Sequence, residues 1–177
     1  TAVLKIFNIG DMEKAKKTLA SKTLASLALS ATLALGLNGK AKAGEWFEYN
    51  DHFYRLTPEV MTWIASEEYA GSKNGYLVTL NDVLEENWLR DTFSSIEPLW
   101  IGFYQPNPGQ NEPAGGWEWI SGEPITYLHW GSGQPDNSQG LEHCAHMNYS
   151  SGWNDAPCNG ELGGYIRGIV EAPVPEP

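Results

Sequence analysis

The stretch that decides the fold runs from Gln134 to Cys158 and reads QPDNSQGLEHCAHMNYSSGWNDAPC. It contains a dense set of hard oxygen donors, three carboxylates and two side-chain amides: Gln134, Asp136, Glu142, Asn154 and Asp155. With a backbone carbonyl, this set supplies the ~6–8 oxygens that Ca²⁺ prefers, and it lacks the imidazole and thiolate groups that favour zinc or copper. Each short motif alone is typical of a solvated turn. Their joint spacing predicts a calcium site.

Short runs of apolar or alternating residues outside this stretch predict β-strands. One strand or hairpin is expected at residues 46–55, and further strands at 76–80, 99–103, 116–120, 143–149 and 165–171. Segments rich in Asn, Gly, Pro and Gln run between the later strands, out to Gly140. Loops of that length inside a compact domain are usually functional.

Two helices are predicted, one before and one after the strand at residues 76–80 in the sequence. The first begins at Thr57-Pro58-Glu59 and ends near Gly71, with a buried side formed by Val60, Ile64 and Tyr69. The second follows an Asn81 cap, and its apolar residues recur at helical spacing: Val83, Leu84, Trp88 and Leu89. The acid pairs on these helices, Glu67-Glu68 and Glu85-Glu86, are interpreted as solvated faces. The order of the elements indicates an α+β fold.

At these residues the sequence resembles the C-type lectin-like domain family. Gln134-Pro135-Asp136 matches the motif of the family's long loop, and Trp153-Asn154-Asp155 matches its later motif. Trp100-Ile101-Gly102 matches the central strand, and Trp117-Glu118-Trp119 matches the strand that follows it. The likeness covers about residues 46 to 172. It implies two helices flanking small antiparallel sheets, with a long calcium-binding loop.

The resemblance also assigns a binding site. It places the principal calcium ion at Gln134, Asp136, Glu142, Asn154 and Asp155. In the family this ion accepts two vicinal sugar hydroxyls, which implies sugar contacts from Gln134, Asp136, Glu142 and Asn154. The amides can donate as well as accept hydrogen bonds, whereas the carboxylates only accept. The Gln-Pro-Asp order is associated with galactose-type sugars, although residues 137–141 lack the aromatic ring that galactose binders usually place there.

The expected function is therefore calcium-dependent carbohydrate binding that leans to galactose-type sugars, with Ca²⁺ as the cofactor. The alternative is the same fold binding a protein or another non-sugar ligand, with calcium only ordering the loop. An enzyme would need His129, His143 or His146 beside a carboxylate. No serine lies in a nucleophile-elbow pattern, so an enzyme is not expected.

Composition limits the partners. The chain is 41% hydrophobic and 12% aromatic, which excludes an intrinsically disordered protein. Its formal charge of −11 argues against nucleic acid, because binding phosphates needs clustered Lys and Arg. A glycan or polysaccharide is the expected partner.

The first 43 residues have the three parts of a secretory signal peptide. A basic region holds Lys14, Lys16, Lys17 and Lys22, an apolar run extends from Leu24 to Leu37, and cleavage is expected after Ala43 in Ala41-Lys42-Ala43. An amphipathic helix is the alternative, but Ser and Thr lie on every face. Export through the periplasm to a secreted or cell-surface location is expected. Cleavage after Ala43 would leave four basic and twenty acidic residues in the rest of the chain, a formal charge of −16.

Export bears on the two cysteines, Cys144 and Cys158, because an oxidising compartment favours a disulfide bond. The alternatives are a thiolate metal site or a nucleophile, but His143-Cys144-Ala145-His146 matches no paired zinc-ligand spacing. The family resemblance supports the bridge, since it pairs a cysteine two residues after an acid, here Glu142, with a later one.

The C-terminal residues, Ala172 to Pro177, resemble the start of a bacterial PEP-CTERM sorting signal. The resemblance implies an exported bacterial protein that is sorted at the membrane through a segment beyond Pro177. A Pro-rich extended tail is the alternative. The expected organisation is thus residues 1–43 as upstream segment and signal peptide, 44–172 as the lectin-like domain, and 173–177 as the beginning of the sorting segment.

Overall fold

The structure, a computed structural model, describes residues 44–94, 96–107, 112–149, 152–160 and 165–173. The elements of these residues are β1 (Phe47–Tyr49), β2 (His52–Leu56), α2 (Trp63–Gly71), β3 (Tyr76–Leu77), α3 (Val83–Thr92), β4 (Leu99–Tyr104), β5 (Glu118–Trp119), the 3₁₀ turn η1 (Ser138–Gly140), β6 (Cys144–Tyr149), β7 (Gly152–Ala156) and β8 (Arg167–Ala172). The α+β class is confirmed. The expected signal peptide and residues 174–177 of the sorting segment lie outside the described residues.

The strands are ordered β1-β2-β8-β4-β6-β7, with β3 added to β8 and β5 to β4. Strand β8 pairs antiparallel with β2 and β3 but parallel with β4. The family resemblance implied antiparallel sheets, but the structure is mixed, because β4 and β8 run parallel. A parallel pair needs a long connection. Here the connection between β4 and β8 contains β5, the long loop of residues 120–143 and the β6–β7 hairpin.

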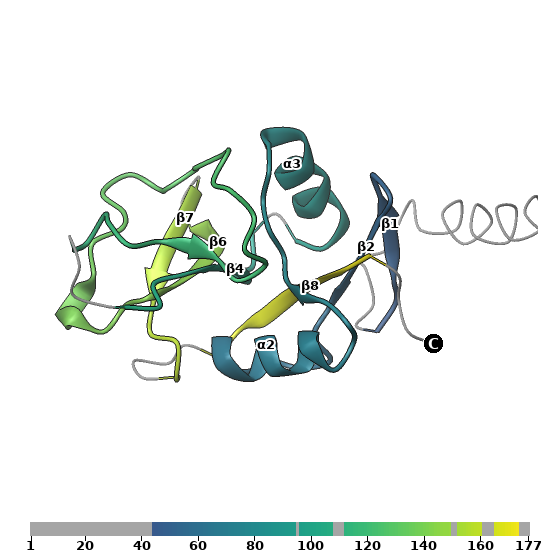
Figure 1. The fold of residues 1–177 in the computed structure, drawn as a ribbon, viewed down its shortest axis with the longest axis horizontal. Helices are drawn as coiled ribbons and strands as arrows, with labels where there is room; N and C mark the ends of the chain where they lie inside the picture. Colours follow the sequence, from purple (N-terminus) through teal and green to yellow (C-terminus); the bar gives the residue numbers. More distant parts are fainter. Residues whose placement is uncertain (1–43, 95, 108–111, 150–151, 161–164, 174–177) are drawn as a thin grey trace, which may run out of the picture. The chain divides into compact units, whose positions relative to one another are not determined.

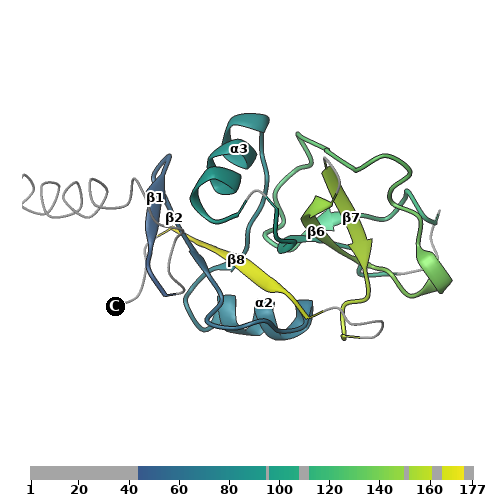
Figure 2. The same ribbon diagram turned by 180° about the vertical axis from the view of Figure 1, so that it is seen from behind.

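The two helices lie on opposite sides of β8, as the two ribbon views agree (Figures 1 and 2). The hydroxyl oxygen of Thr62 caps α2 by accepting from the Ala65 N–H at 3.1 Å, and Asp82 caps α3. The predicted helix start at Thr57 and the predicted cap at Asn81 are wrong. Thr57 is buried, and its hydroxyl donates to the Glu59 carbonyl and accepts from the Gly168 N–H, so it joins the chain to β8.

The faces of both helices also differ from the prediction. Val60 and Ile64 are exposed, and α2 buries Trp63, Ser66 and Ala70 instead. On α3, Val83 and Leu84 are exposed, whereas Glu85 and Glu86 retain only 6% and 1% of their accessible surface. The interpretation of Glu85-Glu86 as a solvated face is wrong. Buried carboxylates need hydrogen-bonding partners, and those partners come from other elements.

An aromatic core fills the space beneath the long loop. Phe103 of β4 contacts four tryptophan rings, with centroids between 4.4 and 5.9 Å away: Trp117, Trp119, Trp130 and Trp153. Gly102, beside Phe103, has to be glycine, because a Cβ there would lie 2.3 Å from the Leu77 carbonyl oxygen. The matched strand signature therefore has a packing reason. It lets β4 approach β3 closely.

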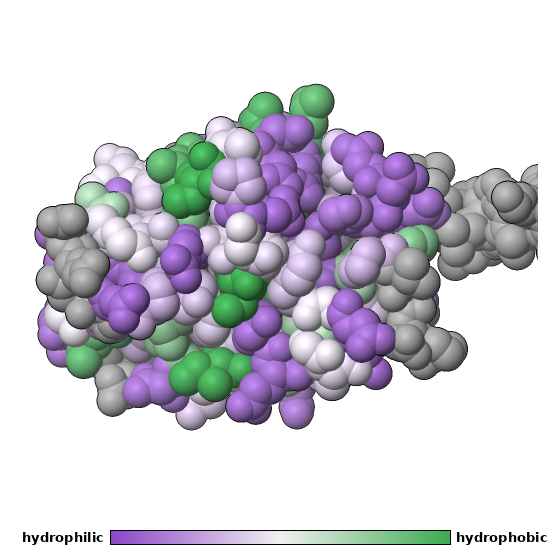
Figure 3. All heavy atoms as spheres, viewed as in Figure 1, coloured by the Kyte–Doolittle hydropathy of each residue, from purple (hydrophilic) through white to green (hydrophobic). Residues whose placement is uncertain are grey.

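The surface of the described residues carries exposed apolar side chains at separate positions, among them Val60, Leu84 and Leu128. Figure 3 shows the hydrophobic residues of one face as separate groups among hydrophilic ones. Within the described residues, none of the helices combines the length and apolar character needed to cross a membrane.

Candidate functional site

The β6–β7 hairpin carries two of the predicted site residues, Asn154 and Asp155. Its register pairs Ala145 with Asp155 and His146 with Asn154. A disulfide bond joins Cys144, at the start of β6, to Cys158, just beyond β7, as predicted. Strand β7 itself was missed by the sequence analysis, which predicted no strand between residues 149 and 165. The bridge and the hairpin together fix the position of Asn154 and Asp155.

The long loop runs beside β7 and is hydrogen-bonded to it. Trp130 forms a parallel bridge with Trp153, and the Gly131 N–H donates to the Trp153 carbonyl at 2.8 Å. The Trp153 N–H donates in turn to the His129 carbonyl at 2.7 Å. Gly131 then accepts from the Gln134 N–H at 3.0 Å. Gln134 is thus held three residues from the point where the loop is anchored to β7.

Asp155 organises the next part of the loop. Its side chain is fully buried, and its two carboxylate oxygens accept from the backbone N–H groups of Asp136 at 3.1 Å and Asn137 at 2.7 Å. Asn137 has a left-handed φ of 46°, a conformation that asparagine tolerates well. Its side-chain oxygen accepts from the Glu142 N–H, and Glu142 accepts from the Ser138 N–H at 2.9 Å. The loop is therefore folded back so that Glu142 faces Asp155.

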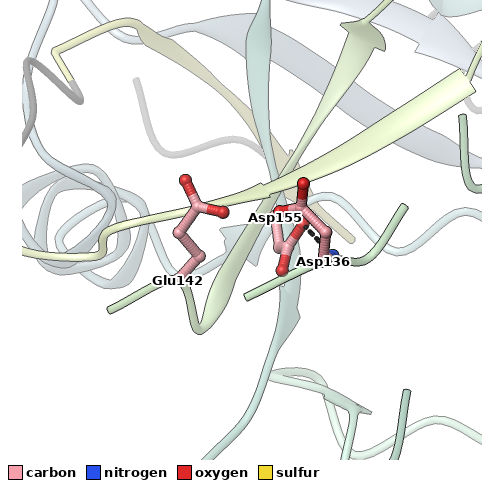
Figure 4. Close-up of side chains that lie close together, drawn as sticks. All are labelled: Asp136, Glu142 and Asp155. Atoms are coloured by element: carbon pink, nitrogen blue, oxygen red, sulfur yellow. Dashed lines mark hydrogen bonds between the residues drawn. The ribbon is translucent and has the colours of Figure 1, made fainter. Parts of the chain in front are cut away.

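The result is a cluster of three carboxylates. Asp136, Glu142 and Asp155 each place an oxygen within 4.8 Å of the others (Figure 4). Burial, together with the charges of Asp155 and Asp136, raises the pKa of Glu142 to about 7. Burial also raises the pKa of Asp155, although the N–H donors from Asn137 and Asp136 oppose the shift. A cation bound among the three carboxylates would oppose both shifts, because a nearby opposite charge favours the ionised form of an acid.

The two amides of the predicted set, Gln134 and Asn154, are close in sequence to Asp136 and Asp155 but differ in their surroundings. Oε1 of Gln134 is buried, and no described residue donates a hydrogen bond to it. A buried acceptor without a partner is costly, and a cation would satisfy it. The three clustered carboxylates fit Ca²⁺, which prefers hard oxygen ligands, and the amide oxygen of Gln134 is of the same ligand type.

Asn154 is held by a histidine that sequence reasoning considered only as a catalytic or zinc candidate. Nδ1 of His146 lies 3.1 Å from the Met147 carbonyl, which only accepts, so Nδ1 carries the proton and Nε2 accepts. Nε2 then receives the Asn154 Nδ2–H at 3.3 Å, and the second Nδ2–H goes to the Asp155 carbonyl. Burial lowers the pKa of His146, which favours this neutral form. Asn154 can therefore offer a bound ion its oxygen.

A family model described as Lectin C-type domain matches residues 59–164, more than half of the chain. The chain belongs to the C-type lectin domain family. The resemblance seen in the sequence is confirmed. This is a family of lectin-like binding domains whose members commonly bind Ca²⁺.

Relatives of this C-type lectin domain include the C-type lectin lectoxin-Phi2 of Philodryas olfersii. It is 32% identical over 146 residues, which cover 77% of this chain and 90% of the relative. Human C-type lectin domain family 10 member A is 32% identical over 120 residues, 64% of this chain and 35% of the relative. Mouse C-type lectin domain family 4 member G is 29% identical, over 68% of this chain. The chain spans only 40% of that mouse relative's length.

Solved structures confirm the fold. The carbohydrate-recognition domain of mouse scavenger receptor C-type lectin superposes with a TM-score of 0.59 at 28% identity, over 72% of this chain and 93% of that domain. Herring type II antifreeze protein gives a TM-score of 0.62 at 22% identity, over 74% and 98%. A calcium-independent type II antifreeze protein, at 22% identity, gives 0.60 over 76% and 96%. C-type lectin folds like this one thus occur both in carbohydrate-recognition domains and in antifreeze proteins.

Proposed function

We propose that this domain binds carbohydrate in a calcium-dependent manner, with a lean toward galactose-type sugars. The observation that supports the proposal most is the convergence of Asp136, Glu142 and Asp155 within 4.8 Å. The side-chain oxygen of Gln134, two residues before Asp136, is buried without a hydrogen-bond partner among the described residues, which leaves it available to a cation. Gln134, Asp136, Glu142, Asn154 and Asp155 are the proposed calcium ligands.

The sugar contacts are assigned to Gln134, Asp136, Glu142 and Asn154. When bound, calcium would supply a Lewis-acid centre for two neighbouring sugar hydroxyls. The protein side chains then complete the hydrogen bonds of those hydroxyls: a carboxylate accepts a hydroxyl proton, and an amide N–H can donate to a hydroxyl oxygen. Asn154 must give up one of its two internal N–H bonds, to His146 or to the Asp155 carbonyl, before it can donate to a sugar.

A second function is favoured by a specific feature of the loop. Residues 137–141 supply no aromatic ring on which the apolar face of a sugar could stack. In this alternative the domain binds a protein or another non-sugar ligand, and calcium serves only to order residues 134–142. The structural likeness to antifreeze proteins is in keeping with such a use of the fold.

We also propose that the domain acts outside the cell. The supporting features are the signal-peptide pattern of residues 1–43, with cleavage after Ala43, and the disulfide bond between Cys144 and Cys158. Residues 44–172 would form the mature lectin domain, and residues 173–177 would begin a PEP-CTERM-like segment that sorts the protein at the membrane.

A glycan array probed with the full chain tests the main proposal. Binding to glycans with terminal galactose-type sugars is expected in millimolar calcium and should be lost in excess EDTA. Glu142→Gln should remove most of the binding, whereas Glu59→Gln, an exposed acid outside the site, should not. Glycan binding that survives chelation would contradict the calcium dependence, and no glycan binding by the calcium-loaded protein would favour the non-sugar alternative.

A further inference from the structure

The buried acid Glu86 connects helix α3 to the long loop. Its carboxylate is 1% exposed, and four hydrogen bonds converge on it. Oε1 accepts from Nε and Nη2 of Arg90, one turn later in the helix, at 3.1 and 2.7 Å. Oε2 accepts from the Tyr127 hydroxyl and is paired with Nδ1 of His129, both at 2.8 Å.

The two oxygens of Glu86 have separate partners. Oε1 faces a charge on its own helix, so Arg90 neutralises the carboxylate without reaching the loop. Oε2 faces two loop residues that are 41 and 43 positions away in the sequence. Since a carboxylate only accepts, His129 must donate from Nδ1. Burial and the Glu86 charge raise the pKa of Tyr127, so its hydroxyl stays a donor.

One of the two loop residues that Glu86 holds, His129, also registers the loop on β7. The His129 carbonyl accepts from the Trp153 N–H at 2.7 Å, and the Gly131 N–H returns to the Trp153 carbonyl at 2.8 Å. Trp153 precedes the proposed ligands Asn154 and Asp155 directly. The segment from Tyr127 to Gly131 is therefore attached to α3 by side chains and to β7 by its backbone.

The neighbouring acid Glu85 makes a useful contrast. It lies on the same helix, is 6% exposed, and also accepts from a tyrosine hydroxyl. Its partners, however, are Tyr54 of β2 at 2.7 Å and the Asn81 N–H at 2.9 Å. Neither partner belongs to the segment from Tyr127 to Gly131.

We propose that Glu86 is a positioning residue for the cation and ligand site, because it holds His129, where the loop is registered on β7, and the nearby Tyr127. The inference rests on the proposed calcium site. Glu86 itself does not bind the ion. It fixes the segment that leads to Gln134 and Asp136, so weakening its hydrogen bonds weakens calcium binding.

The test compares Glu86→Gln, Tyr127→Phe and the matched control Glu85→Gln in the full chain. Calcium affinity is measured by titration calorimetry well below the melting temperature, and melting is measured in EDTA. Glu86→Gln should weaken calcium binding about tenfold, the usual lower range for residues that position metal ligands. Tyr127→Phe, which keeps the ring, should weaken it about threefold. The calcium affinity of Glu85→Gln should stay within about twofold of the wild-type value, even if its melting temperature falls as much as that of Glu86→Gln.

Calcium affinities of Glu86→Gln and Tyr127→Phe that match wild type, or an equal loss in Glu85→Gln, would overturn the proposal. If Glu86→Gln does not fold, Tyr127→Phe carries the comparison. A wild-type chain that binds no calcium would overturn the proposed function. In that case, hydrogen exchange in EDTA tests whether Glu86 positions the loop. The amides of Asp136 and Asn137 should exchange several-fold faster in Glu86→Gln than in Glu85→Gln. Equal exchange rates would exclude the positioning role.

Discussion

The carboxylate of Asp155 holds the backbone of Asp136 while its negative charge faces the Asp136 side chain. Oδ1 of Asp155 accepts from the Asp136 N–H at 3.1 Å, and the two carboxylates lie within 4.8 Å of each other and of Glu142. The same residue thus folds the loop and adds to the repulsion within it. A divalent cation would relieve the repulsion and leave the backbone hydrogen bonds in place.

Calcium should therefore stabilise the domain. An ion that binds only the folded state adds RT ln(1 + [Ca]/Kd), about 2.7 kcal/mol at a hundredfold excess over Kd. For a domain of this size we expect the melting temperature to rise by roughly 5–15 °C. Scanning calorimetry in calcium and in EDTA measures the difference. An unchanged melting temperature at millimolar calcium would mean that no calcium ion binds at this site.

The stability of the calcium-free domain should fall as the pH rises from about 5 to about 7. Burial raises the pKa values of the folded-state acids Glu67, Glu85, Glu142, Asp155 and Glu171 above their ordinary values. In that interval the folded state binds more protons than the unfolded state, so the free energy of unfolding decreases with pH. The lowered pKa of His146 acts in the opposite direction but is a single group.

Calcium should reverse this dependence at the site. Protons compete with the ion for Glu142, whose pKa in the calcium-free protein is about 7. The rise in melting temperature caused by calcium should therefore grow between about pH 5 and pH 7, while the melting temperature in EDTA falls. A calcium effect of constant size across this interval would mean that Glu142 does not bind the ion. Glu142→Gln should make the calcium effect smaller and less dependent on pH.

Much of the fold followed from local patterns, and the errors have a common physical cause. Strand β4 was predicted because Leu99 to Phe103 is a short apolar run, a pattern typical of a buried strand. Strand β7 was missed because Trp153 is its only large apolar residue, and its pairing with β6 depends on backbone hydrogen bonds. The alternation of apolar and polar residues cannot reveal a strand such as β7, in which Asn154 and Asp155 are adjacent polar residues.

The helix faces show the same limit. Glu86 looks like a solvated acid, because its partners Tyr127 and His129 lie more than forty residues away. In the site, the resemblance to the family supplied the set of ligands, and three of the five converge in the structure. The fold-back of the loop depends on Asp155 accepting backbone N–H groups, which no side-chain pattern predicts. The orientation of Asn154 by His146 likewise requires the hairpin register.

Removing the disulfide should lower stability by about 3 kcal/mol, because Cys144 and Cys158 close a short loop, with a separation of 14 residues. The double variant Cys144→Ser with Cys158→Ser avoids a reactive single thiol. Its free energy of unfolding in urea is compared with that of the oxidised wild type. In protein collected after export, thiol titration should find both cysteines oxidised. Two free thiols in that material would contradict the assignment of this domain to an oxidising compartment.

The order of amide and acid in the loop should control which sugar is bound. Exchanging them, as Gln134→Glu with Asp136→Asn, keeps the formal charge and the number of oxygen donors, so calcium affinity should change little. The fold-back should also survive, because Asp155 holds residue 136 through its backbone N–H rather than its side chain. What reverses is the direction of hydrogen bonding, since an amide can donate where a carboxylate only accepts.

A sugar hydroxyl that faces two acceptors loses a partner, and an unpaired polar group costs about 1–3 kcal/mol. Since 1.4 kcal/mol corresponds to a factor of ten, the double variant should shift from galactose-type toward mannose-type ligands by about tenfold or more. Binding to both sugar classes is measured by competition, and calcium affinity by calorimetry on the same samples. The single variant Asp136→Asn, which removes a charge, should instead lose calcium. Unchanged sugar preference in a double variant that still binds calcium would mean that Gln134 and Asp136 do not touch the ligand, and that calcium only orders the loop.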